Sequence, residues 1–311
     1  MPFTLELNQV SKSFDEFVAV DRLSFAIREG EIFGLLGPNG AGKTTSIRMM
    51  IGITIPDSGS IQAFGRPLSR QLLDRIGYLP EERGLYKKMK VLENLVFLAG
   101  LKGIAPTEAT RRVEQWLERL ELANWKNAKV EELSKGMQQK VQFIAAVLHD
   151  PDFMILDEPF SGLDPASALV LKDVLLDQKK KGKTILFSTH RMDTVERLCD
   201  SICLVNHGRS VLSGGLREVK ARYGRSNVQL EYEGTLPLLE DRSRVASYND
   251  YGNYVELRPA DGTDAQQLLR AAMETARIRR FEMVEPSLEE IFIATVEEGK
   301  AVAGSKEVSH A

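Results

Sequence analysis

The chain has 311 residues, of which 43% are hydrophobic and 27% are charged, and its formal net charge is −3. This length is enough for one large domain and one small domain, and the nearly balanced charge argues against a protein that coats nucleic acid or binds membranes through a polybasic surface. We expect no secretory signal and no membrane span, because no stretch holds roughly 18 uninterrupted apolar residues. If the protein works at a membrane, another chain is expected to supply the spans.

Residues 1–33 alternate apolar and polar side chains, as an antiparallel edge sheet does. Farther along the chain, short and nearly continuous apolar runs predict strands that are buried on both faces. These runs are EIFGLLG (31–37), FMILD (153–157), TILFST (184–189) and SICLV (201–205). Helical stretches separate them, so we expect an α/β fold with a mostly parallel sheet covered by helices.

Between about residues 91 and 150 the strand signals stop, and this part of the chain predicts an inserted helical subdomain. One helical face there is formed by Val113, Trp116, Leu117 and Leu120. We expect Trp116 and the second tryptophan, Trp125, to anchor the core of the subdomain.

After residue 222 the pattern starts afresh, so we place a large domain at 1–222 and a small α+β domain at 226–298. Within the small domain, strand-like segments at 228–234 and 253–259 precede a helical stretch at 264–276. Ser287 and Glu290 have capping-box spacing before a further helix. The last residues, 299–311, are expected to form a disordered tail.

The stretch GPNGAGKTT matches the phosphate-loop pattern G-x-x-x-x-G-K-[ST] and stands between a predicted strand and a predicted helix. Its glycines allow the backbone to curl so that successive N–H groups point at phosphate oxygens. Lys43 would reach the β- and γ-phosphates and the Thr44 hydroxyl would hold Mg²⁺. The candidate nucleotide-binding residues are Gly37, Pro38, Asn39, Gly40, Ala41, Gly42, Lys43, Thr44 and Thr45. The alternative is a glycine-rich turn that binds nothing.

The segment FMILDEP (153–159) delivers two acids to the carboxyl end of a predicted strand. Asp157 is a candidate Mg²⁺ ligand, directly or through water, and Glu158 is the candidate catalytic group that orients or deprotonates an attacking water. The alternative is an acidic turn between strand and loop. Together with the phosphate loop, these acids predict a nucleoside triphosphatase, and they leave open a GTPase, a small-molecule kinase, a helicase or a transporter motor.

Three further motifs discriminate among these classes. SGLD (161–164) follows the two acids directly, and LSKGMQQK (133–140) opens a predicted helix. STH (188–190) ends the next strand and puts His190 beside the same phosphate pocket, where we expect it to contact the γ-phosphate. The alternative for His190 is a structural histidine at a strand end.

In this order and at these intervals the motifs resemble those of the ATP-binding-cassette (ABC) family, and the resemblance spans about residues 3–220. It implies a P-loop NTPase cassette that uses ATP with Mg²⁺. It also implies that two cassettes bind two ATP molecules at a shared face, where the signature loop of one closes over the γ-phosphate held by the other.

The usual signature of the family is L-S-G-G-Q. Here Leu133, Ser134 and Gly136 match it, while Lys135 and Met137 depart from it. The phosphate contact needs a hydroxyl and a closely approaching backbone N–H at a helix N-terminus, and Ser134 and Gly136 keep both. We therefore interpret the loop as functional.

Two other positions take their roles from the resemblance. Glu81 stands where the family usually has a glutamine whose oxygen approaches Mg²⁺, and a carboxylate is also able to ligate Mg²⁺; the alternative is a surface acid. Phe14 stands where the family stacks an aromatic ring on adenine, with Phe17 as the fallback and burial under the edge sheet as the alternative.

Three functions compete. In the first, the chain is an ATP-hydrolysing subunit at the cytoplasmic face of a membrane, paired with a second cassette, as a homodimer, and with a transmembrane permease on a separate chain. The appended C-terminal domain then resembles that of drug- and sodium-efflux (ABC-2 type) exporters. In the second, it is a soluble ATPase acting on ribosomes or DNA, but no basic stripe is present and we expect no nucleic-acid partner. The third, a nucleotide-sensing module with little turnover, is disfavoured by Glu158.

Overall fold

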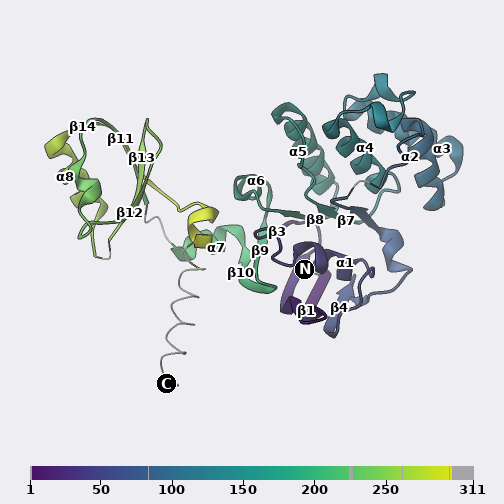
Figure 1. The fold of residues 1–311 in the computed structure, drawn as a ribbon, viewed down its shortest axis with the longest axis horizontal. Coiled ribbons are helices and arrows are strands. Elements are labelled where there is room, and N and C mark those ends of the chain that lie inside the picture. Colours follow the sequence, from purple (N-terminus) through teal and green to yellow (C-terminus); the bar gives the residue numbers. More distant parts are fainter. Residues whose placement is uncertain (1, 83, 224–226, 261, 294, 296–311) are drawn as a thin grey trace. The chain divides into compact units, whose positions relative to one another are not determined.

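The computed structural model describes residues 2–82, 84–223, 227–260, 262–293 and 295, so the predicted tail at 299–311 lies outside the described residues. The chain divides into two compact units, Met1–Leu216 and Arg217–Ala311, which are described separately (Figure 1). Among the described residues, none of the helices combines the length and the apolar character that crossing a membrane requires.

A six-stranded sheet forms the centre of the first unit, in the order β10-β9-β3-β8-β7-β6. Its strands are β3 (Ile32–Leu36), β6 (Ile76–Leu79), β7 (Phe153–Asp157), β8 (Thr184–Thr189), β9 (Ser201–Asn206) and β10 (Arg209–Gly215). All neighbours pair in parallel except β10, which pairs antiparallel with β9. Every residue of β3 and β7 is buried, as the continuous apolar runs predict for strands covered on both faces. The carboxyl ends of the parallel strands meet at one edge.

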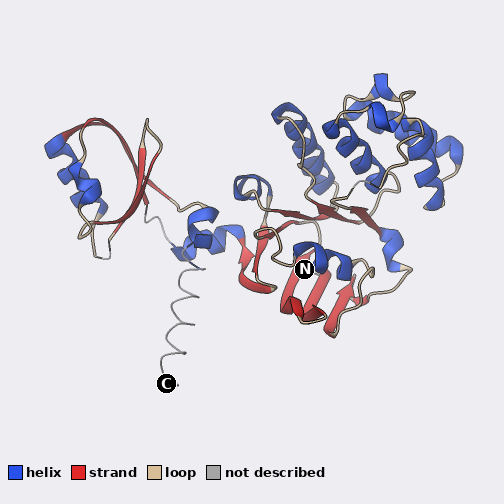
Figure 2. Cartoon of the chain, in the orientation of Figure 1, coloured by secondary structure: helices blue, strands red, loops and turns tan. Residues whose placement is uncertain are grey.

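A separate antiparallel sheet in the order β2-β1-β4-β5 holds the N-terminal residues, as their alternating pattern predicts. Its strands are β1 (Phe3–Phe14), β2 (Phe17–Arg28), β4 (Ser58–Ala63) and β5 (Arg66–Pro67). Apolar side chains from β1 and β2 share one buried cluster with those of β3 and of helix α1 (Lys43–Met50). This cluster packs the later residues of α1 against strands of both sheets; Figure 2 shows the helix and the sheets.

Between β6 and β7 the described residues form helices and no strand: α2 (Val91–Leu101), α3 (Pro106–Arg119) and α4 (Lys135–Val147), with 3₁₀ turns at Ala123–Trp125 and Val130–Glu132. Val113, Leu117 and Leu120 are buried on one face, as predicted. Trp116 packs edge-to-face on Phe143, with 6.0 Å between ring centroids. The prediction for Trp125 is wrong: it is 41% exposed, because it lies on a 3₁₀ turn instead of on the apolar face of α3.

Two helices follow β7 and β8, the strands that lead to the acids and to His190. Helix α5 (Pro165–Lys180) is capped by Asp164, whose carboxylate accepts a hydrogen bond of 3.0 Å from the Ser167 N–H. Helix α6 (Met192–Leu198) follows β8. A short 3₁₀ helix (Leu72–Arg75) leads into β6.

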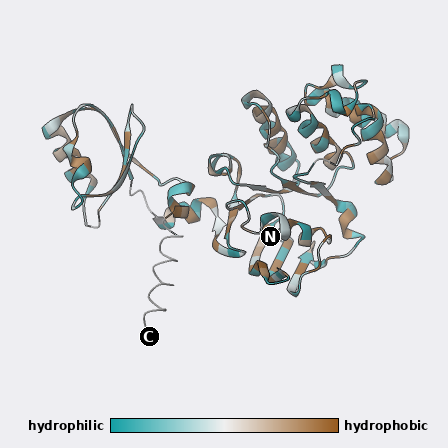
Figure 3. Ribbon diagram, in the orientation of Figure 1, coloured by the Kyte–Doolittle hydropathy of each residue, from teal (hydrophilic) through white to brown (hydrophobic). Residues whose placement is uncertain are grey.

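The second unit has its own antiparallel sheet, in the order β12-β13-β11-β14. Its elements are α7 (Leu216–Tyr223), β11 (Asn227–Gly234), a 3₁₀ helix (Pro237–Glu240), β12 (Val245–Asp250), β13 (Val255–Pro259), α8 (Ala265–Thr275), β14 (Ala276–Val284) and a helix over 288–293. The core joins β11 residues such as Leu230 to α8 residues such as Leu268. The predicted capping box forms: the Ser287 N–H donates to the Glu290 carboxylate (2.8 Å) and the Glu290 N–H donates to the Ser287 hydroxyl (3.2 Å). Helices of both units carry apolar and polar residues side by side (Figure 3).

Candidate nucleotide-binding and hydrolysis site

The phosphate loop connects β3 to α1. Two of its glycines occupy positions where a residue with a side chain would not fit. Gly37 has φ 149° and Gly42 has φ 103°. A Cβ atom at Gly37 would overlap the Val205 carbonyl oxygen, and one at Gly42 would overlap the Ala19 carbonyl oxygen. A residue with a side chain would therefore force the loop away from β2 and β9.

Lys43, the first residue of α1, is held across this loop. Its Nζ donates hydrogen bonds to the carbonyl oxygens of Gly37 (2.7 Å) and Pro38 (3.0 Å). Burial lowers the pKa of Lys43, while the carboxylates of Glu158, Asp157 and Glu81 act in the opposite direction. The ammonium group therefore shares the cavity with three carboxylates and keeps one N–H donor for an anionic ligand.

A cavity of about 310 Å³ joins the phosphate loop to the acids. Its lining residues are Phe17, Ala19, Asn39, Gly40, Gly42, Lys43, Thr44, Thr45, Glu81, Asp157 and Glu158. Of the remaining loop residues, Gly37 and Pro38 face Lys43 through their carbonyl groups and Ala41 is buried. Glu81 is thus brought beside the two acids of the DEP segment.

The aromatic ring that lines this cavity is Phe17. Phe14 and Phe17 are paired across the tip of the β1–β2 hairpin and are 49% and 63% exposed. Phe14 is absent from the cavity lining, and the Lys12 ammonium lies 5.6 Å from the centroid of its ring. Stacking of Phe14 on adenine stays a prediction.

Asp157 is 1% exposed at the end of β7 and has an incomplete set of partners. Oδ1 accepts a hydrogen bond from the Ser188 hydroxyl, and Thr44 lines the same cavity as the carboxylate. Oδ2 is buried and has no partner among the described residues. Burial raises the pKa of Asp157. An unpartnered buried carboxylate oxygen next to a hydroxyl fits a hard divalent cation such as Mg²⁺.

Glu158 is fixed both through its backbone and through its carboxylate. Its φ of 48° places it in the left-handed region, which costs free energy in a residue with a side chain. Its N–H donates to the carbonyl oxygen (3.2 Å) and the hydroxyl (3.1 Å) of Ser188. The carboxylate accepts from the Thr189 hydroxyl (3.2 Å) and from the His190 N–H (3.2 Å). The strained turn therefore aims the carboxylate into the cavity.

The imidazole of His190 contacts Glu158: Nδ1 lies 2.8 Å from Oε1 of the carboxylate. The His190 side chain is 55% exposed and does not line the 310 Å³ cavity. The two predicted catalytic residues are therefore in direct contact, whereas the expected γ-phosphate contact of His190 stays a prediction.

Ser134 and Gly136 lie at the start of α4. The Ser134 hydroxyl caps the helix by accepting a hydrogen bond of 3.2 Å from the Met137 N–H. A Cβ at Gly136 would lie 3.0 Å from the Gly162 carbonyl oxygen, so the signature turn packs closely on the SGLD loop. Ser134 is exposed, and neither residue lines the cavity formed by the phosphate loop of the same chain.

Two glutamines on α4, which the sequence did not single out, connect this helix to the acidic loops. The Gln139 amide donates to the carbonyl oxygens of Glu158 (3.4 Å) and Pro159 (3.3 Å). The Gln142 amide donates to those of Pro80 (3.0 Å) and Glu82 (2.8 Å), on both sides of Glu81. The sequence feature that could have predicted these contacts is a pair of glutamines, three residues apart, on a helix face otherwise formed by apolar residues.

Two family models match the chain. The ABC transporter model matches residues 20–161. The model for the C-terminal domain of ATP-binding proteins like DrrA1-3 matches residues 214–296.

Curated relatives match over most of the chain. The uncharacterized ABC transporter ATP-binding protein YhaQ of Bacillus subtilis is 46% identical over 292 residues, which are 94% of this chain and 98% of the relative. The Nod factor export ATP-binding protein I of Burkholderia thailandensis is 42% identical over 216 residues, 68% of this chain and 71% of the relative.

Solved structures that match 71% of the chain confirm the predicted fold class. An ATP-binding subunit of an ABC transporter has a TM-score of 0.66 at 34% identity and covers 71% of this chain and 93% of its own. CbiO1 of Clostridium perfringens, part of the cbiONQ ABC transporter complex, has a TM-score of 0.63 at 28% identity, covering 71% and 92%. The resemblance carried by the sequence motifs is confirmed, and the chain belongs to the family of ABC transporter ATP-binding proteins.

Proposed function

We propose that this chain hydrolyses ATP to drive a membrane exporter, as a peripheral subunit at the cytoplasmic face. The observation that carries the proposal is the single cavity in which Lys43, Asp157 and Glu158 converge on the phosphate loop. ATP-binding ABC proteins as a family hydrolyse ATP, and export is the activity in the name of the Burkholderia relative. The match of the C-terminal unit to DrrA1-3-like proteins is a second point in favour of this group.

In this proposal the triphosphate of ATP lies along the loop at 37–45, bound by backbone N–H groups and by Lys43. Thr44, Asp157 and Glu81 are the residues that would hold Mg²⁺, which when bound neutralises charge on the phosphates. The unpartnered Oδ2 of Asp157 supports this assignment. Phe14 is the proposed adenine contact, with Phe17 nearer the phosphate end of the cavity.

Glu158 orients the attacking water and accepts its proton. The water oxygen bonds to the γ-phosphorus as the bond to the β–γ bridging oxygen breaks, releasing ADP and inorganic phosphate. His190 holds the Glu158 carboxylate in place and, with nucleotide bound, supports the γ-phosphate. The first of these roles depends on the 2.8 Å contact between Nδ1 of His190 and Oε1 of Glu158.

A second cassette completes each site in this proposal. Ser134 and Gly136 are exposed or half-buried and lie outside the cavity of their own chain, so they are available to close over ATP held by another copy. The helix N-terminus behind Ser134 suits a phosphate oxygen. Cassette closure would then follow ATP binding, and hydrolysis would reopen the pair.

The transmembrane partner has a candidate docking surface on the first unit. The first unit exposes several large apolar side chains, including Ile53, Ile55, Tyr86, Phe97 and Leu101. Tyr86 and Phe97 pack edge-to-face at 5.6 Å, and a cavity of about 270 Å³ lies beside Ile53. An apolar segment of a separate chain would remove these side chains from water.

Hydrolysis is tested by phosphate release from the purified full-length chain. We expect Glu158→Gln to keep ATP binding, to lose turnover by roughly 10²- to 10⁴-fold and to accumulate as an ATP-bound dimer in size-exclusion chromatography. Glu114→Gln, a change of a surface acid on α3, is the matched control and keeps wild-type turnover. Normal turnover in Glu158→Gln contradicts the catalytic assignment.

The membrane role is tested by recovering the tagged chain from gently solubilised native membranes. We expect a multi-span protein at a stoichiometric level, and its loss in Phe97→Glu but not in Met273→Glu, a more exposed apolar position of the second unit. Recovery with ribosomes or DNA in place of a membrane protein supports the soluble ATPase.

A further inference from the structure

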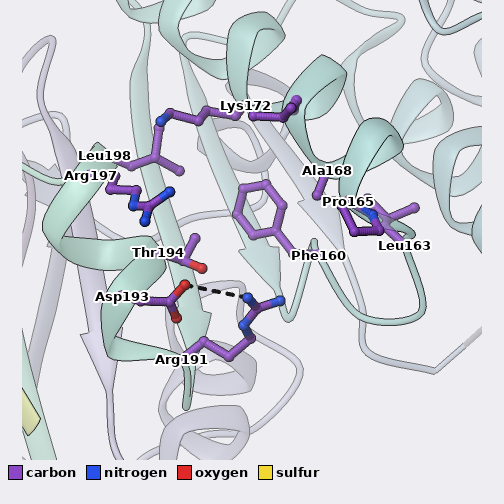
Figure 4. A pocket seen from close by; sticks show the side chains of 11 residues that line it. Phe160, Leu163, Pro165, Ala168, Lys172, Arg191, Asp193, Thr194, Arg197 and Leu198 are labelled. Atoms are coloured by element: carbon purple, nitrogen blue, oxygen red, sulfur yellow. Dashed lines mark hydrogen bonds and ion pairs between the residues drawn. The ribbon is translucent and has the colours of Figure 1, made fainter. Parts of the chain in front are cut away.

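A second cavity, of about 360 Å³, lies between α5 and α6 and has no part in the proposed ATP cycle. Its volume falls in the range of about 300–1,000 Å³ that is typical of small-molecule sites. Figure 4 shows side chains from both helices and from the two preceding loops around one space. The cavity joins an apolar part to a cationic part.

The apolar part is centred on Phe160. The ring is buried and packs edge-to-face on Phe187, with 5.9 Å between centroids, so it forms a fixed wall. In Figure 4 the Phe160 ring lies between Leu198 of α6 and Ala168 of α5. Leu169, which is exposed, extends the apolar lining outward. An alkyl chain or ring would bury its surface against these side chains.

The charged part of the lining consists of Lys172, Arg191 and Arg197 with Asp193 as the one acid. Asp193 pairs with Arg191 at 3.3 Å. Within the part of the chain that the structure describes, Lys172 and Arg197 have no ion-pair partner. Two cations, from two different helices, are therefore left uncompensated at the edge of an apolar cavity. This combination is complementary to an anion that carries an apolar group.

We propose that this cavity binds an amphipathic carboxylate, with the carboxylate at Lys172 and Arg197 and the apolar chain against Phe160. Arginine and lysine both donate strong charge-assisted hydrogen bonds to a carboxylate. Phe160 is two residues after Glu158, and Arg191 follows His190. An occupant touches the loops that carry both proposed catalytic residues, so occupancy slows ATP turnover; this regulatory part rests on the proposed function.

Binding is measured by calorimetry on the full-length chain with three probes: decanoate, 1-decanol and acetate. We expect one saturable site for decanoate, no comparable binding of the neutral alcohol and none of acetate. Lys172→Gln and Arg197→Gln each weaken decanoate binding by about tenfold, as loss of one charge-assisted contact does. Lys180→Gln, a change of a lysine at the far end of α5, leaves it unchanged.

Four results overturn the proposed binding site. Equal binding of 1-decanol and decanoate shows that the negative charge of the ligand does not contribute to affinity. Unchanged binding in both glutamine variants shows that Lys172 and Arg197 do not bind the carboxylate. Lys43→Ala must retain decanoate binding, because a loss there assigns the carboxylate to the phosphate loop. Loss of decanoate binding in the ATP-bound dimer of Glu158→Gln assigns the cavity to contact between two copies and likewise overturns the proposal.

Regulation is tested separately, by phosphate release at saturating decanoate. We expect lower turnover in the wild type and no change in Arg197→Gln, which leaves the proposed catalytic groups intact. Unchanged wild-type turnover overturns the regulatory part. An inactive wild-type chain instead contradicts the proposed function, and the calorimetric result then decides on the binding site by itself.

Discussion

The Nδ1 atom of His190 lies 2.8 Å from Oε1 of Glu158, and the same carboxylate oxygen also accepts the His190 backbone N–H at 3.2 Å. The histidine therefore restricts the carboxylate from two directions. Because the Glu158 backbone is itself in the left-handed region, the orientation of this acid depends on contacts with the end of β8 and with His190, some 30 residues along the chain.

We expect His190→Ala to lower kcat by roughly 10²-fold with little change in the affinity for ATP, because the phosphate loop is untouched. Phosphate release and calorimetry separate the two effects. His207→Asn is the control: His207 is exposed and has φ 47°, which asparagine tolerates. Equal losses in the two variants argue against a specific role of the Glu158 contact.

Gln142 links α4 to the loop that carries Glu81, and its removal leaves two carbonyl oxygens, of Pro80 and Glu82, without their amide donor. We expect Gln142→Ala to lower the free energy of unfolding by about 1–3 kcal/mol. The variant also needs more Mg²⁺ for half-maximal ATP binding, because Glu81 is no longer held beside the cavity. Urea unfolding and calorimetry at varied Mg²⁺ measure both effects.

Gln115→Ala on α3, where the side chain is exposed, is the control for Gln142→Ala and leaves both quantities unchanged. A normal Mg²⁺ requirement in Gln142→Ala, combined with reduced stability, assigns this glutamine a structural role alone.

In the nucleotide-free protein, ionisation of Asp157 lowers the free energy of unfolding, and this effect depends on pH. Burial raises its pKa above the ordinary value of 3.8, so the folded protein binds more protons than the unfolded chain between the two pKa values. The free energy of unfolding therefore falls as pH rises through that window and stays reduced above it. Above the window, the protein contains a buried carboxylate with an unpartnered oxygen.

We expect Asp157→Asn to be more stable than the wild type at neutral pH, by about 1–3 kcal/mol. We also expect this variant not to bind Mg²⁺–ATP in a form that is hydrolysed. The stability difference shrinks as pH falls toward 3.8. Urea unfolding at several pH values, without nucleotide, measures it, and Asp173→Asn on exposed α5 surface serves as control. A stability difference that grows as pH falls would mean that the pKa of Asp157 is lowered in the folded protein.

Local sequence patterns were sufficient to predict a structural feature where the residues that form it are neighbours in sequence. The phosphate loop, β7 with its two acids and the capping box of Ser287 all follow from short stretches of this kind. Strand β14 was missed because five of its nine residues are exposed and it carries three arginines, so its strand character comes from pairing with β11. Gln142 and Ser188 were missed because their partners lie 60 and 30 residues away.

The tip of the β1–β2 hairpin provides the last test, because Phe14 and Phe17 are paired there and only Phe17 lines the cavity. Apart from Ala19, the other lining residues are those of the phosphate loop and the acids. In the proposed binding mode this cavity therefore holds the triphosphate, and the base lies beyond it. We expect Phe14→Ala to weaken ATP binding about tenfold, the loss of one base–aromatic stack. Phe17→Ala has a smaller effect. Calorimetry with ATP and with inorganic triphosphate distinguishes the two positions: the Phe14 effect is confined to ATP, and a loss confined to Phe17→Ala assigns the stack to that ring.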